Sequence, residues 1–199
     1  MRKYVFLFVI MMVGNFVFSQ PPITWHEPEF VDGICVNDSI NIFHRLPVRM
    51  KDSVRKPVWD LSQNTAGEFI HFTTSATAIK VRYTLAGKNF SMPHMPSTGV
   101  SGLDLFAKDD NGKWNWAPGR YHFSDTCTYD FTNLLISKNA SDIADFYLYL
   151  PLYNSVTWLS IGVKESESFA FAPRSKKKPI VAYGTSILQG GVASRPGLA

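Results

Sequence analysis

A serine that follows a short apolar run is the residue of this sequence best placed to do chemistry. Residues 180–182 are apolar, and the run ends in Gly184-Thr185-Ser186. Such a run is typical of a strand buried on both faces of a parallel sheet. Open α/β sheets place their reactive groups at the carboxyl ends of their strands. Ser186 is therefore a candidate nucleophile, and Gly184 would relieve crowding at the turn before it.

The pattern around this serine differs from the G-x-S-x-G turn of α/β-hydrolases, because Leu188 stands where the second glycine is required. It resembles instead the first block of the SGNH/GDSL hydrolases, a family of serine esterases and acylhydrolases. Residues 184–187, 189–191 and 193–197 look like the variant of bacterial members with an N-terminal β-sandwich, in which Thr185 replaces the usual Asp. Residues 61–67, 94–102 and 149–154 are similar to segments of that N-terminal domain.

The resemblance implies a jelly-roll-like β-sandwich packed beside an α/β (flavodoxin-like) catalytic domain. Ser186 would be the nucleophile and its backbone N–H an oxyanion donor. The substrate class it implies is a small acyl ester, with acylated carbohydrates among the candidates, and it implies no cofactor.

A serine hydroxyl becomes a good nucleophile only when an oriented base takes its proton. The family resemblance implies that base and partner lie in an Asp-x-x-His motif. No histidine of this sequence follows an Asp by three residues; they are His26, His44, His71, His94 and His122. We therefore expect this chain to be the N-terminal part of an esterase. Its expected partner is the catalytic domain that this sequence lacks, and we expect the chain to be inactive without that domain.

The N-terminus has the pattern of a secretory signal peptide. Basic residues at positions 2 and 3 precede an almost wholly apolar run, and Val17 and Ser19 are small-residue positions before a cut near Gln20. The run of about fifteen residues is short for a membrane-spanning helix, which needs about twenty, although an uncleaved anchor is the alternative. Residues 1–20 are thus predicted to be removed on export, to the periplasm or outside a bacterial cell, without stable membrane insertion afterwards.

Charge and cysteine content point to few other functions. The formal net charge of +4 falls to about +2 without the basic leader residues, so the sequence pI near 9.0 does not indicate nucleic-acid binding. Cys35 and Cys127 form a disulfide in an oxidising compartment or remain buried thiols. Neither cysteine has a His or Cys at metal-ligand spacing, so we predict no metal site.

Residues 21–173 have the pattern of a mainly β domain. Alternating runs predict strands at 68–73 and 79–85, joined by a hairpin connection at 74–77. A second hairpin is predicted around Asn111-Gly112, and further strands at 146–150 and 156–163. Several short strands separated by turn residues predict a β-sandwich or jelly roll. The cationic run 174–179 is read as a surface linker, with an anionic-surface patch as the alternative, and 180–199 as the start of the catalytic domain.

Two aromatic and histidine features leave alternatives open. Trp114 and Trp116 suit sugar stacking, but a two-residue turn at Asn111-Gly112 would place both on the Leu103/Leu105 face, in the core. His94 lies in a proline-stiffened loop that suits either packing or an active-site wall, and His71 is most simply a surface or paired strand histidine. The rival to the esterase is a non-catalytic β-sandwich module that binds carbohydrate or a protein partner.

Overall fold

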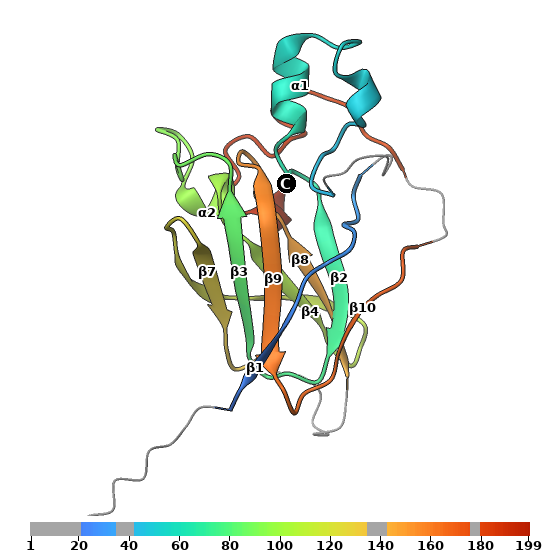
Figure 1. Ribbon diagram of the computed structural model, residues 1–199, viewed down its shortest axis with the longest axis vertical. Helices are drawn as coiled ribbons and strands as arrows, with labels where there is room; N and C mark the ends of the chain where they lie inside the picture. Colours follow the sequence, from blue (N-terminus) through green and yellow to red (C-terminus); the bar gives the residue numbers. More distant parts are fainter. Residues whose placement is uncertain (1–20, 35–41, 135–142, 176–179) are drawn as a thin grey trace, which may run out of the picture.

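The protein folds into two antiparallel β-sheets packed face to face (Figure 1). The computed structural model describes residues 21–34, 42–134, 143–175 and 180–199. The first sheet has the strand order β1 (Ile23–His26), β9 (Val156–Lys164), β3 (Ile79–Leu85), β7 (Cys127–Phe131) and β6 (Gly119–His122). The second has the order β10 (Phe169–Phe171), β2 (Phe69–Thr74), β8 (Ala144–Tyr149), β4 (Asp104–Lys108) and β5 (Trp114–Ala117). The predicted mainly β sandwich is confirmed.

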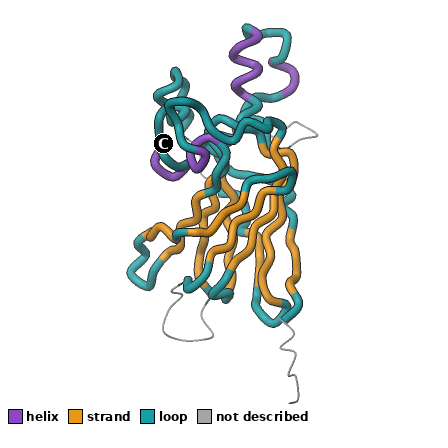
Figure 2. Tube along the Cα trace, turned by 90° about the vertical axis from the view of Figure 1, so that its left-hand side faces the viewer, coloured by secondary structure: helices purple, strands orange, loops and turns teal. Residues whose placement is uncertain are grey.

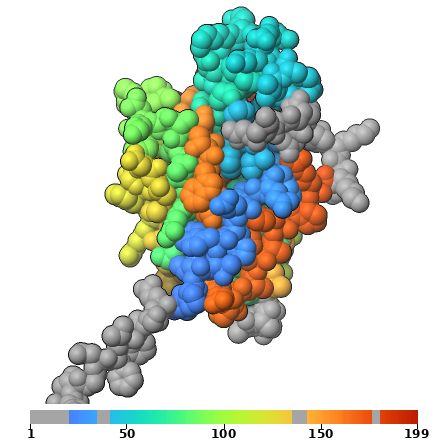
Figure 3. Space-filling view, viewed as in Figure 1, coloured from blue at the N-terminus to red at the C-terminus, as the bar shows by residue number. Residues whose placement is uncertain are grey.

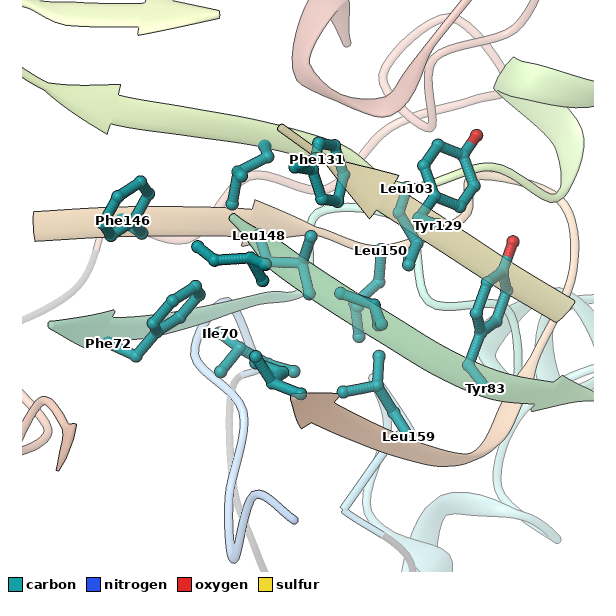
Figure 4. Close-up of a cluster of buried hydrophobic side chains, with 14 of the residues drawn as sticks. Ile70, Phe72, Tyr83, Leu103, Tyr129, Phe131, Phe146, Leu148, Leu150 and Leu159 are labelled. Carbon is teal, nitrogen blue, oxygen red and sulfur yellow. The ribbon is translucent and has the colours of Figure 1, made fainter. Parts of the chain in front are cut away.

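The core lies between the two sheets and follows from the two-residue alternation of the strands. In β3 the side chains of Ile79, Val81 and Tyr83 are buried, whereas those of Lys80 and Arg82 point to solvent. Strands of the second sheet supply the facing layer, in which Phe72 and Phe146 stack 5.3 Å apart (Figure 4). Burial of apolar side chains from both inner faces is the main stabilising contribution in such a sandwich.

The predicted hairpin between residues 68–73 and 79–85 is wrong. The strands β2 and β3 form close to the predicted positions, but β2 belongs to the second sheet and β3 to the first. The connection at 75–78 therefore crosses between the sheets, and its residue Ala76 is fully buried. Alternation shows that a strand has one buried face. It does not show which sheet the strand joins, because both sheets of a sandwich face the same core.

The predicted core position of the two tryptophans is also wrong. The β4–β5 hairpin forms, but Phe106 pairs with Trp116 and Lys108 with Trp114, so that residues 109–113 make the connection. The predicted two-residue turn would pair Ala107 with Trp116. The observed pairing is shifted by one residue, and such a shift moves every side chain of the strand to the other face of the sheet. Both tryptophans consequently lie on the outer face of the second sheet.

One end of the sandwich carries the helices and the C-terminal segment (Figures 1 and 2). They are α1 (Lys56–Ser62), α2 (Ser97–Val100) and the 3₁₀ turns η1 (Val48–Met50) and η2 (Pro196–Leu198). These elements are too short to give a sustained helical period, which is why the sequence pattern did not indicate them. In the space-filling view α1 forms a knob above the sheets (Figure 3). In the described residues no helix has the length and apolar character needed to cross a membrane.

The predicted strand at 180–182 does not form. Residues 180–184 have no regular secondary structure, and Ile180 is fully exposed. A buried strand of a parallel sheet needs hydrogen-bonding neighbours on its edges, and the described part of the chain places no strand beside this one. The leader 1–20 and linker residues 176–179 lie outside the described residues, so those predictions stay predictions.

Candidate functional site

Ser186 lies on an exposed turn at the helical end of the sandwich. Residues 185–191, which we call the nucleophile turn, are closed by backbone hydrogen bonds from Gln189 N to Thr185 O at 3.2 Å and from Gly191 N to Ser186 O at 2.7 Å. The hydroxyl and the backbone N–H of Ser186 make no hydrogen bond within the described residues. A Cβ on Gly184 would lie 3.0 Å from the Leu188 side chain, so the chain packs closely at this residue.

No histidine hydrogen-bonds Ser186 in the part of the chain that the structure describes. His71 instead lies 3.1 Å from Asp145, as expected for a paired strand histidine, and His26 stacks on Phe169 at 4.1 Å. His94 and His122 are exposed, and burial lowers the pKa of His44. The described residues therefore place none of these histidines within hydrogen-bond distance of Ser186.

Two side-chain contacts hold the nucleophile turn on the sandwich. The Tyr153 hydroxyl donates to the carbonyl oxygen of Ser186 at 3.1 Å. The Gln189 amide is held from both sides, since its Oε1 accepts from Arg45 Nη2 at 3.2 Å and its Nε2 donates to Leu152 O at 3.0 Å. These contacts join residues that are far apart in the sequence, and no sequence pattern predicted them.

Close packing of the nucleophile turn against the β8–β9 loop, which contains Leu152, requires glycine in the turn. Gly190 has a φ of +90°, and a Cβ at this position would lie 2.9 Å from the Leu152 side chain. A Cβ on Gly191 would lie 2.9 Å from the carbonyl oxygen of Ser186. Substitution at either position would therefore displace the turn.

A second anchor is the contact of Arg195, nine residues after Ser186, with the carboxylate of Asp104. The Asp104 carboxylate accepts from Arg195 Nη1 and from Gly197 N, each at 2.9 Å, and from Trp116 Nε1 at 2.6 Å. Its side chain is only 4% exposed. Burial raises the pKa of Asp104, whereas the Gly197 N–H and the Arg195 guanidinium oppose that increase. These donors satisfy a buried acid that would otherwise be costly.

The helix α2 touches the segment between these anchors. The Thr98 hydroxyl donates to Ser194 O at 2.6 Å. A Cβ on Gly99 would lie 2.2 Å from Ala193 O, so only glycine allows this approach. The sandwich therefore holds residues 185–199 at three places: at the nucleophile turn, at Ser194 and at Asp104.

Arg45, which binds Gln189, lies near a buried acid. The Arg45 side chain also donates to Asn64 O at 2.9 Å and to Leu61 O. Glu68 is fully buried and neither of its carboxyl oxygens has a hydrogen-bond partner. Burial raises the pKa of Glu68 well above its ordinary value, and the charge of Arg45 opposes this only in part. Nothing in the sequence pattern marked either residue.

The remaining predicted sites give less. Cys127 is buried, and its Sγ lies 3.3 Å from Ser124 O. Cys35 lies outside the described residues, so the pairing of the two cysteines stays a prediction. The described residues contain no group of three or more His, Cys, Asp or Glu side chains that could hold a metal ion.

Comparison with known proteins identifies related domains. A family profile named GxDLY, described as the N-terminus of SGNH-hydrolase-type esterases, matches residues 23–169. Residues 102–106 read Gly-Leu-Asp-Leu-Phe, which fits that name except for Phe106 at the Tyr position, and this signal could have singled out Asp104. No curated protein matches the sequence.

Two solved structures are similar. A Bacteroides ovatus ATCC 8483 protein provisionally named a GDSL-like lipase superposes with a TM-score of 0.79 at 31% identity, over 89% of this chain and 51% of that one. The salicylyl-acyltransferase SsfX3 from a tetracycline biosynthetic pathway has a TM-score of 0.53 at 16% identity, over 77% and 43%, which is a likeness of fold alone. The present chain thus spans about half the length of each matched structure.

Proposed function

We propose a function from the premise that this chain belongs to the family of SGNH-type esterases, whose N-terminal domain it contains. It is the N-terminal portion of an exported serine esterase in which Ser186 is the nucleophile. The observation that carries the proposal is the exposed turn at Ser186, which the sandwich holds. Within the described ranges the serine hydroxyl and backbone N–H make no hydrogen bond.

The proposed reaction is acyl transfer to water in two steps. Ser186 Oγ attacks an ester carbonyl, its proton passes to the base, and the alcohol leaves with a proton to give an acyl-enzyme. Water then attacks the acyl group and releases the acid, which restores the serine. The Ser186 N–H stabilises the developing oxyanion, and one such donor is typically worth about 2.7–4 kcal/mol. No step requires a cofactor.

The general base comes, in this proposal, from outside these 199 residues. Support comes from the matched structures, which are about twice as long as the aligned segment, and from the absence of a histidine next to Ser186 in the described residues. The signal-peptide pattern supports action on substrates outside the cytoplasm, and acyl esters of carbohydrates fit that setting.

The test uses the protein extended through its catalytic domain. We expect it to hydrolyse p-nitrophenyl acetate and acetylated oligosaccharides and to be labelled by a fluorophosphonate probe. Ser186→Ala should abolish both, and the matched control Ser194→Ala, which alters another exposed serine of the same segment, should keep both. Labelling that persists in Ser186→Ala would place the nucleophile elsewhere.

A groove on the sandwich favours a second candidate function, carbohydrate binding. It has a volume of about 760 Å³ and lies between the edge strands β5 and β6. Trp116 is 47% exposed at its rim, and aromatic faces of this kind stack on sugar rings. The side chains of Arg120, Thr132 and Asn133 also line it and have no hydrogen bond or ion pair within the described residues. They could therefore donate to sugar hydroxyls.

Calorimetric titration with neutral oligosaccharides tests this second candidate on the 199-residue chain. Arg120→Ala should weaken binding, whereas Lys88→Ala, which changes an exposed cation away from the groove, should not. Trp116 is left intact because it also binds Asp104. Absence of heat with every oligosaccharide would remove this candidate.

A further inference from the structure

The carbonyl group of the candidate nucleophile accepts a hydrogen bond from outside its own turn. Ser186 O accepts from Gly191 N at 2.7 Å within the turn and from the Tyr153 hydroxyl at 3.1 Å. Tyr153 belongs to the loop between β8 and β9, so the second donor comes from the sandwich. Burial raises the pKa of Tyr153, and its hydroxyl thus remains a donor at neutral pH.

The loop that presents Tyr153 is fixed on both sides. Leu152, which is fully buried, donates its N–H to Gly99 O at 3.2 Å, and the N–H of Tyr153 donates to Val100 O at 3.1 Å. The buried Asn154 side chain binds the backbone of Gly87 through both of its polar atoms, each at 3.0 Å. These hydrogen bonds therefore hold the backbone of Tyr153 in place relative to the sheets.

A second contact of the same turn starts from an equally fixed group. Arg45 is half-buried, and its guanidinium binds the carbonyl oxygens of Asn64 and Leu61 as well as Gln189. The other side of the Gln189 amide binds Leu152 O, one residue before Tyr153. Two neighbouring points of the sandwich thus grip the turn at Ser186 and at the residue three positions later.

We propose that Tyr153 is a positioning residue for Ser186, and that the sandwich rather than the catalytic domain fixes the peptide group that follows the nucleophile. The hydroxyl of Tyr153 restricts rotation about the Cα–C bond of Ser186 (its ψ angle). The Gln189 contacts prevent the rest of the turn from following such a rotation. This inference rests on the proposed role of Ser186.

Positioning of this kind acts on the rate of the chemical step. The serine hydroxyl and its N–H must meet the ester carbonyl in one geometry, and small misplacements reduce the rate. Ser186 is exposed, and the Tyr153 hydroxyl is the side-chain donor to its carbonyl group, so removal of that hydroxyl widens the range of conformations at Ser186. Substrate affinity changes little, because the hydroxyl is occupied by the protein's own backbone.

The kinetic test compares Tyr153→Phe with the wild type in the protein extended through its catalytic domain. We expect kcat and the rate of fluorophosphonate labelling to fall together by roughly two- to tenfold, as one net hydrogen bond implies, with KM and the thermal midpoint unchanged. Tyr121→Phe is the matched control, since Tyr121 is 48% exposed and its hydroxyl contacts no part of the turn. An unchanged kcat, or a change confined to KM or to thermal stability, would overturn the proposal.

A second measurement separates this inference from the proposed function. Hydrogen–deuterium exchange on the 199-residue chain follows the amides of residues 186–193 without any catalysis. Tyr153→Phe should increase their exchange several-fold, and Tyr121→Phe should not. If the extended protein proves inactive but this exchange increases, the proposed function fails while the structural grip stands; if the exchange of the two variants is equal, the grip itself is refuted.

Discussion

The guanidinium of Arg195 lies 4.2 Å from the centroid of the Trp116 ring, and both side chains donate to the same buried carboxyl group. That group belongs to Asp104 in β4, and Trp116 lies in the adjacent strand β5. Since Arg195 follows Ser186 by nine residues, this pair ties the segment of the candidate nucleophile to the outer face of the second sheet. The acid of the Gly-x-Asp-Leu pattern therefore has a structural task at the junction.

Loss of the Asp104 charge should loosen that junction. In Asp104→Asn the amide presents N–H groups where Arg195 and the Gly197 N–H need an acceptor. Because the site is buried, we expect the free energy of unfolding to fall by about 1–3 kcal/mol. Denaturant titration of the 199-residue chain measures this change, and hydrogen exchange at residues 193–199 should increase with it.

The control for this substitution is Asp110→Asn, which changes an exposed acid in the turn between β4 and β5. It should leave both the unfolding free energy and the exchange unchanged. Equal stability of Asp104→Asn and Asp110→Asn would show that the junction contributes nothing to folding.

Glu68 predicts a dependence of stability on pH. Burial raises its pKa in the folded state well above the ordinary value of 4.5, so the folded protein keeps a proton that the unfolded chain releases. Its contribution to stability is thus fully present below about pH 4.5 and is lost as the pH rises toward and through the raised pKa. The amide in Glu68→Gln cannot ionise, and the stability of this variant relative to the wild type should therefore increase steadily over that range.

Urea titrations of both proteins at several pH values above 4.5 measure this difference. Glu165→Gln, at an exposed position, serves as the control and should run parallel to the wild type. A difference between Glu68→Gln and wild type that stays constant with pH would mean that Glu68 ionises in the fold as readily as in the unfolded chain.

Local patterns in the sequence predicted the sandwich but not its pairing. The Asn111-Gly112 signal located the β4–β5 hairpin correctly. The Asp109 carboxylate, however, accepts from Asn111 N at 3.0 Å and from Lys113 N at 2.9 Å, and this widens the connection to five residues. A side chain that binds its local backbone thereby moved both tryptophans to the outer face, which alternation alone could not foresee.

The sequence marks a candidate nucleophile but does not mark the groups that hold its turn. The short block around Ser186 is a local signal. Its anchors are contacts over long sequence separations, such as Tyr153 with Ser186 and Arg45 with Gln189. Each depends on the final packing of sandwich loops, so only the three-dimensional structure brings the partners together.

Residues 23–172 should fold without the C-terminal segment. The strands from Ile23 to Phe171 form both sheets and enclose the main core, to which residues 180–199 contribute no side chain. A chain ending at residue 172 should unfold cooperatively and give a far-UV circular dichroism spectrum of β type, with a modest loss of stability from uncovering Leu152. A helical or unfolded spectrum would contradict this assignment of the domain.

The 199-residue chain itself should be inactive, although it contains Ser186. Without a base the serine hydroxyl keeps its high pKa, and loss of the base in serine hydrolases costs several orders of magnitude in rate. In the described residues the side chains that donate hydrogen bonds to the nucleophile turn are those of Tyr153 and Arg45, and neither is a general base at neutral pH. Hydrolysis of p-nitrophenyl acetate by this chain should therefore equal that of Ser186→Ala, and a fluorophosphonate should label neither. Labelling of the short chain at Ser186 would show that one of its own five histidines reaches the serine in solution, and that the base is not supplied from elsewhere.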